Sequence, residues 1–129
     1  MDRENTTQVV AAVIRKDDTY LICQRPSNKR HGELWEFPGG KVLKNESFID
    51  AICRELEEEL NLIVSSVGET LYVSDEINSQ FVIHFIEIEA ANDPILKEHK
   101  DLKWANKQQI REFDLAPSDK EFVFNFFSI

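Results

Sequence analysis

The segment that most constrains the fold of this chain is residues 47–60, which has the pattern of one amphipathic helix. Ser47 precedes Asp50 by three positions, and a Ser-x-x-Asp sequence of this kind caps a helix N-terminus. Apolar side chains then recur at helical spacing, at Ile49, Ile52, Cys53, Leu56 and Leu60. We therefore predict a helix whose apolar stripe packs on a sheet.

The same helix carries a cluster of acids. Glu55, Glu58 and Glu59 are related by i, i+3 and i+4, so their carboxylates share one face, where like charges cost roughly 0.2–0.5 kcal/mol per pair. Arg54 precedes Glu58 by four positions and relieves part of this repulsion. Such a face is either a plain solvated surface or a site for a hard cation such as Mg²⁺, which prefers oxygen ligands.

The residues before the helix favour the cation site. Gly39 and Gly40 end a strand, and a backbone without side chains can approach phosphate or metal closely. From Gly40 the chain reads as glycine, five residues, Glu46, seven residues, then RELEEELNL over 54–62. This resembles the Nudix box, G-x5-E-x7-REUxEExGU with U apolar, at every specified position except Asn61, where the family has glycine. Asparagine is the next best residue for the left-handed conformation that ends a helix.

The rest of the chain has the pattern of an α+β protein. Strand patterns of apolar and β-branched residues occupy residues 8–15, 20–25, 35–37, 69–77, 80–89 and 101–104. The first two predict a hairpin, and 69–77 with 80–89 predict a second hairpin that turns around 78–79. Helices are expected at 106–112 and at 118–127, the latter with Ser118 as its N-cap.

Length and composition restrict the class of protein. A chain of 129 residues is expected to form one domain, residues 1–129, around one core. The net charge of −9 opposes binding to a nucleic-acid polymer. Cys23 and Cys53 are expected to be free thiols, and the early apolar run is too short for a signal peptide or membrane span. These features predict a cytoplasmic protein without membrane attachment.

The resemblance to the Nudix family implies an α/β/α sandwich around a mixed sheet and a hydrolase that uses Mg²⁺ or Mn²⁺. It implies that the metal is bound by the carboxylates of Glu55, Glu58 and Glu59 and by the carbonyl of Gly39. Arg54 and Glu46 are then expected to orient the acids through salt bridges. Glu98 is either a further metal ligand or base, or a plain surface acid. The base that takes the proton of the attacking water is then Glu55 or Glu98.

Two further patterns, WEFPGGK at 35–41 and LAPSD at 115–119, look like the MutT branch of the family, including its CTP pyrophosphohydrolases. That branch converts nucleoside triphosphates to monophosphates and pyrophosphate, which implies a sanitising role in the nucleotide pool.

The MutT resemblance also implies where a nucleotide would bind. It places Arg25, Lys41 and Arg30 near the phosphates. Phe37 is expected either against the base or in the core. Asp119 is expected to contact the base: an ionised carboxylate suits the amine of cytosine, whereas 8-oxoguanine requires a protonated one. Both 8-oxo-dGTP and CTP or dCTP derivatives therefore stay open as substrates, as does a purely structural Asp119 in the first turn of the last helix.

Three other readings compete with this function. The first is a Nudix hydrolase of dinucleoside polyphosphates or nucleotide sugars, and the second is a non-catalytic nucleotide-binding Nudix module. The third is an interaction protein whose acidic helix contacts a basic partner, which leaves the spacing of Gly40 and Glu46 unexplained. A monomer or a weak homodimer is expected.

Overall fold

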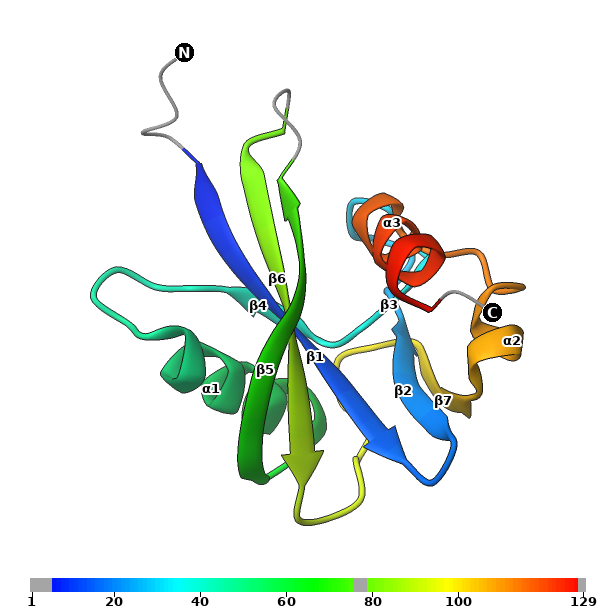
Figure 1. The fold of residues 1–129 in the computed structure, drawn as a ribbon, viewed down its shortest axis with the longest axis horizontal. Coiled ribbons are helices and arrows are strands. Elements are labelled where there is room, and N and C mark those ends of the chain that lie inside the picture. The colour runs from blue at the N-terminus through cyan, green and yellow to red at the C-terminus, as the bar shows by residue number, and fades with distance from the viewer. Residues whose placement is uncertain (1–5, 76–78, 128–129) are drawn as a thin grey trace.

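The computed structural model describes residues 6–75 and 79–127. Its elements in chain order are β1 (Thr7–Lys16), β2 (Thr19–Gln24), β3 (Trp35–Glu36), β4 (Gly39–Lys41), α1 (Phe48–Leu60), β5 (Val64–Asp75), β6 (Phe81–Ala90), β7 (Asp101–Ala105), α2 (Lys107–Ile110) and α3 (Pro117–Phe126). Figure 1 shows α1 on one side of the strands and α3 on the other.

The sheet is mixed and divides at β1. This strand runs parallel to β6, from Thr7 opposite Phe81 to Ile14 opposite Ile88, and antiparallel to β4. It pairs with β2 only around the tight turn, at two positions. Beyond that point β1 and β2 diverge, and β2 pairs instead with β3 and β7 (Figure 1). The divergence leaves one edge of β1 free for the short strand β4.

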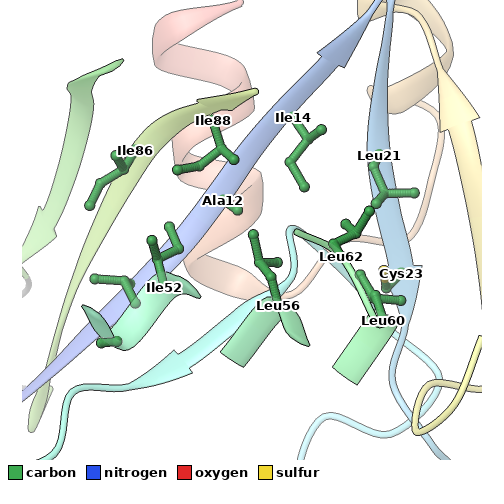
Figure 2. Close-up of a cluster of buried hydrophobic side chains, with 12 residues drawn as sticks. Ala12, Ile14, Leu21, Cys23, Ile52, Leu56, Leu60, Leu62, Ile86 and Ile88 are labelled. Carbon is green, nitrogen blue, oxygen red and sulfur yellow. The ribbon is translucent and has the colours of Figure 1, made fainter. Parts of the chain in front are cut away.

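Alternate residues of β1 belong to two hydrophobic cores. Val10, Ala12 and Ile14 share one core with α1, and Figure 2 shows Ile52 and Leu56 of that helix on the side of β1 that carries Ala12. Side chains of the opposite face meet aromatic rings from β6 and from α3 and its end, of which Phe85, Phe122 and Phe127 are fully buried. Strands buried on both faces confirm the predicted α/β/α sandwich.

Helix α1 confirms the strongest sequence prediction. Ser47 Oγ accepts a hydrogen bond from the Asp50 backbone at 3.0 Å, so the predicted cap is formed. Asn61 ends the helix in the left-handed conformation at φ 56°. Ile49, predicted in the buried stripe, is 53% exposed, because Phe48 fills that place in the first turn and packs on His84.

Several predicted boundaries were wrong. β5 begins at Val64 rather than at residue 69, because its register shifts let the polar segment 65–69 pair with β6 despite lacking regular alternation. Helix α2 covers only Lys107–Ile110, and Asn106 is its cap. Helix α3 begins at Pro117 after Ala116, so Ser118 lies inside its first turn rather than at the cap. The predicted strand end at 77 and turn residue Asn78 lie outside the described residues.

The cysteines behave as expected from the sequence. Both are free thiols, with Cys23 buried in the α1 core and Cys53 partly buried against it. Among residues 6–75 and 79–127, no helix has the length and apolar character needed to cross a bilayer.

Candidate active site

The acidic face of α1 meets the sheet at β4, where two glycines keep the contact free of side chains. Gly40 lies opposite Val10 of β1, and Gly39 lies opposite Ala11. A Cβ atom on Gly40 would lie 1.6 Å from Oε2 of Glu55, and one on Gly39 would lie 1.9 Å from the carbonyl oxygen of Val10. Glycine at position 40 therefore allows the Glu55 carboxylate to lie directly against the backbone of β4.

Arg54 holds the loop before α1 to the helix. Its guanidinium binds both oxygens of Glu46, at 2.8 Å and 3.0 Å, and donates to the Lys41 carbonyl at 3.0 Å. Glu46 also accepts a hydrogen bond from the Leu43 backbone at 2.9 Å. The Arg54 hydrogen bonds, then that of Leu43, lower the pKa of Glu46 to about 2. The predicted salt bridge is formed, and it is bidentate.

Glu55 and Glu59, which lie on α1, have the opposite electrostatic behaviour. Burial raises the pKa of Glu59 to about 9, and the charges of Glu55, Glu36 and Glu98 add to this rise. Burial is also the largest cause that raises the pKa of Glu55, although Arg54, 3.5 Å away, opposes it. The helix therefore presents carboxylates that favour protonation unless positive charge is supplied.

This donor set fits a hard divalent cation. Oε1 of Glu59 is buried and has no hydrogen-bond partner among the described residues, as expected for an oxygen that a cation would satisfy. The convergence expected from helical spacing is incomplete, because Glu58 is 55% exposed and turned toward Arg54 at 3.4 Å. Accordingly, no group of three acidic, histidine or cysteine side chains in the described residues already has the arrangement of a metal site. To join Glu55 and Glu59 around a cation, the side chain of Glu58 would have to turn away from Arg54.

Glu98 lies within electrostatic reach of the acidic cluster. It is exposed, in the segment between β6 and β7. Its charge contributes to the raised pKa of both Glu55 and Glu59, which places it on their side of the molecule. This location is consistent with either a ligand or a base.

A cleft of about 720 Å³ lies beside the acidic cluster and touches it at Gly39 and Gly40. Its walls come from β1, β4, β6 and the start of α3, at residues far apart in the sequence. The predicted substrate-binding residues Arg25, Arg30, Phe37, Lys41 and Asp119 all line it. The structure therefore brings together the residues that the resemblance assigned to the nucleotide.

The positively charged side chains of the cleft are held in different ways. Arg25 donates to Glu36 at 2.9 Å and to the Arg30 carbonyl at 2.7 Å, so its guanidinium has a fixed position. Lys41 is exposed, with its ammonium 5.9 Å from the centre of the Phe81 ring at the cleft wall. The cleft thus has both a hydrogen-bonded and an exposed cationic side chain for anionic groups.

Asp119 lies at the buried end of the cleft. The segment before α3 pairs with β3, where the Trp35 carbonyl accepts from Ala116 at 2.8 Å, and this contact brings Asp119 beside Phe37. One carboxyl oxygen accepts a hydrogen bond from the Phe37 backbone at 2.8 Å. Burial, followed by the charge of Glu36, raises the pKa of Asp119 well above its usual value. The buried group thus favours its neutral form, which both donates and accepts hydrogen bonds.

The sequence leaves two positions open for Phe37, and the structure selects the core. Its side chain is 3% exposed, and its ring packs edge-on against Phe85 and Phe122. A ring covered in this way has no free face for stacking on a base. Phe37 contributes its backbone N–H to the cleft through Asp119.

Comparison with known families now agrees with this geometry. A family profile described as "NUDIX domain" matches residues 5–126. This chain belongs to the Nudix family. It is a MutT-like Nudix hydrolase, and the box over residues 40–62 forms the loop, helix and helix end described above.

Two relatives of this Nudix hydrolase resemble it over most of their length. The CTP pyrophosphohydrolase of Escherichia coli strain K12 is 37% identical over 117 residues, which cover 87% of this chain and 84% of the relative. A putative 8-oxo-dGTP diphosphatase 2 of Mycobacterium tuberculosis is 30% identical over 118 residues, covering 89% and 84%. A MutT Nudix hydrolase structure from Burkholderia pseudomallei has a TM-score of 0.84 at 23% identity, covering 97% of this chain and 100% of that one, which confirms the fold.

The structure adds two residues of this Nudix hydrolase that sequence reasoning missed. Glu36 binds Arg25 on one side and contacts His99 on the other. His99 in turn lies 3.7 Å from Glu59. Glu36 interrupts an aromatic strand within the 35–41 motif, which was a usable signal, whereas nothing in the pattern around His99 indicated burial.

Proposed function

We propose that this Nudix hydrolase is a Mg²⁺-dependent nucleoside triphosphate pyrophosphohydrolase that converts its substrate and water to a nucleoside monophosphate and pyrophosphate. The observation that carries the proposal is one cleft with arginines along its wall, a buried Asp119 at one end and the acidic face of α1 beyond Gly39 and Gly40. This arrangement suits a ligand with a base at one end and a phosphate chain that extends toward a cation site.

The residues of the cleft have separate tasks in the proposed reaction. Arg25, held by Glu36, and the neighbouring Arg30 and Lys41 bind the phosphates and align them. The glycines of β4 keep the passage between the phosphates and α1 free of side chains. These contacts favour in-line attack at phosphorus with pyrophosphate as the leaving group.

The acids of α1, together with the Gly39 carbonyl, would hold Mg²⁺ or Mn²⁺ through Glu55, Glu58 and Glu59, with Glu98 as a further ligand. When bound, the cation supplies charge neutralisation and lowers the pKa of water. Glu55 lies against Gly40 at the boundary of cleft and cluster, so we propose it as the base, with Glu98 as the alternative. Arg54 and Glu46 keep α1 in place relative to β4.

The burial of Asp119 supports 8-oxo-dGTP as the first candidate substrate. A neutral carboxyl group can donate to O6 of 8-oxoguanine and accept from its N7–H, whereas unmodified guanine has acceptors at both atoms. Asp119 is buried and its pKa is raised, which supports the neutral form. The proposed role is therefore the removal of oxidised nucleotides from the pool.

CTP and dCTP derivatives are the second candidate. The relative from Escherichia coli with 37% identity carries the name CTP pyrophosphohydrolase. A neutral carboxyl can also pair with the N3 and N4 amine of cytosine. A neutral Asp119 therefore discriminates strongly against guanine. It discriminates less between 8-oxoguanine and cytosine.

A pyrophosphate-release panel with Mg²⁺ tests the proposal. It includes the common nucleoside triphosphates, 8-oxo-dGTP, 5-methyl-dCTP and 2-hydroxy-dATP, each with the parent protein and with Asp119→Asn. We expect the highest kcat/KM for 8-oxo-dGTP and a retained preference over dGTP in the variant, because the asparagine amide, like a neutral carboxyl group, offers one donor and one acceptor. A panel in which dGTP equals 8-oxo-dGTP would refute the proposed base reading.

Two variants of α1 separate hydrolysis from mere binding. Glu58→Gln should abolish turnover, and Glu57→Gln, one exposed position away, should leave it unchanged. Turnover that survives Glu58→Gln would contradict the assigned metal ligand. No pyrophosphate from any triphosphate would instead direct the search to dinucleoside polyphosphates, nucleotide sugars or a binding module.

The free thiols support the expected cytoplasmic location, and the expected monomer or weak homodimer stays a prediction.

A further inference from the structure

His99 is a buried histidine next to the proposed metal cluster, and the mechanism above does not use it. Its side chain is 6% exposed. The following residue, Lys100, donates its backbone N–H to the Gln24 carbonyl at 2.9 Å, and β7 then pairs with β2. The ring is therefore held in place by the sheet rather than by a loose surface loop.

The Nε2 atom of His99 lies between two carboxylates. It is 3.1 Å from Oε2 of Glu36 and 3.7 Å from Oε1 of Glu59. Glu36 is the partner within hydrogen-bond distance, and because a carboxylate oxygen accepts hydrogen bonds, the tautomer that fits this contact carries its hydrogen on Nε2. The other oxygen of Glu36 accepts from Arg25 at 2.9 Å. A continuous chain of contacts thus runs from the cleft through Glu36 and His99 to Glu59.

The environment of this ring is poorly explained by stability alone. Nδ1 is buried and has no hydrogen-bond partner among the described residues. An unsatisfied buried nitrogen is unfavourable, and an apolar side chain of similar size would avoid that cost. An apolar side chain could not, however, supply the contact that Nε2 makes with the two carboxyl groups.

We propose that His99 is a positioning residue that donates a hydrogen bond from Nε2 to Glu36, and that it thereby fixes Glu59 for the cation and Arg25 for the phosphates. This inference rests on the proposed function, since it assumes that Glu59 is a metal ligand. A buried donor between Glu36 and Glu59 offsets the repulsion of two neighbouring carboxylates, and partners of metal ligands orient those ligands in many sites.

The test compares His99→Leu, which fills the space without a donor, with His99→Gln, whose amide can donate near the position of Nε2. Mn²⁺ binding to the nucleotide-free protein is measured by electron paramagnetic resonance, and KM and kcat are measured on the preferred triphosphate. We expect His99→Leu to weaken Mn²⁺ binding by about 10-fold or more. KM should rise through Arg25 while kcat at saturating metal and nucleotide changes less, and His99→Gln should restore most of both losses.

Controls keep the test decisive. His84→Gln alters a histidine that contacts Gln8 and does not line the cleft, and it should change neither binding nor KM. If the Leu variant fails to fold, His99→Asn replaces it in the test. The asparagine side chain is too short for its amide to reach Glu36, so this variant should show the same loss. Parent-like Mn²⁺ affinity and KM in the Leu or Asn variant would overturn this inference alone. Absence of Mn²⁺ binding by the parent protein would overturn the metal site and this inference together.

Discussion

At the scale of single residues, identical side chains acquire different chemistry from their surroundings. Glu46 and Glu59 both belong to the Nudix box, yet the pKa of the first is lowered to about 2 and that of the second is raised to about 9. Arg54 hydrogen bonds cause the lowering, whereas burial among other acids causes the rise. Glu46 is therefore suited to structural pairing and Glu59 to binding a cation.

Gly40 and Gly39 offer a matched pair of substitutions. In Gly40→Ala the new Cβ meets the flexible carboxylate of Glu55, so we expect a folded protein whose turnover falls at least about 10-fold as that group is displaced. In Gly39→Ala the new Cβ meets the rigid backbone of Val10, and residue 39 has a φ of +156°, so we expect a loss of stability as well. Steady-state assays and thermal unfolding of both variants measure this. Full activity in Gly40→Ala would contradict the placement of Glu55.

The raised pKa of Asp119 predicts a pH dependence of stability. The unfolded chain loses this proton near 3.8, the ordinary pKa of an aspartate, whereas the folded protein keeps it to higher pH. Between those values the folded state binds more protons, so the free energy of unfolding falls as pH rises. Asp119→Asn removes this contribution. Urea unfolding from pH 5 to pH 8 should therefore show the free energy of unfolding of the variant increasing relative to that of the parent protein. Asp18→Asn, an exposed control, should run parallel to the parent protein.

At the scale of elements, the site depends on how two helices are held against the sheet. Helix α1 is fixed to the backbone of β4 by Arg54, which donates to the Lys41 carbonyl. Helix α3 is fixed to β5 by Glu121, which accepts hydrogen bonds from Tyr72 at 2.6 Å and Ser74 at 3.1 Å. One helix presents the acidic cluster and the other presents Asp119, so their separation sets the length of the site.

The end of α1 can be tested through Asn61, where the family has glycine. Its φ of 56° strains any residue with a Cβ, although asparagine tolerates it best after glycine. We expect Asn61→Ala to lower the free energy of unfolding by roughly 1 kcal/mol and Asn61→Gly to preserve or raise it. Urea unfolding measures both, with Glu57→Ala on the same helix as a nearly neutral control. Equal stability of the Ala and Gly variants would count against a strained helix end.

At the scale of the whole molecule, the net charge of −9 and the acidic face of α1 make folding sensitive to divalent cations. A ligand bound only by the folded state stabilises it by about 2.7 kcal/mol at 100 times its Kd. We therefore expect MgCl₂ to raise Tm more than NaCl of equal ionic strength. Glu59→Gln should reduce this difference, and differential scanning calorimetry measures it. An equal rise in both salts would indicate charge screening without a site.

The local pattern was sufficient for α1, its capping by Ser47 and its end at Asn61, whereas the pairing of Arg54 with Glu46 was expected from the family resemblance. These features depend on residues a few turns apart, whose geometry follows from helical spacing. The mixed sheet and its coverage on both faces were implied by the family resemblance. The start of β5 was missed because register shifts break the regular alternation of that strand.

The cleft required contacts that the local pattern does not encode. Asp119 reaches Phe37 across 82 positions, and His99 reaches Glu36 across 63. Periodicity shows which face of an element is apolar, but it does not show what covers that face or which polar group is enclosed with it. The burial of Phe37, the neutral tendency of Asp119 and the contacts of His99 therefore arise only when distant elements exclude water from the same space.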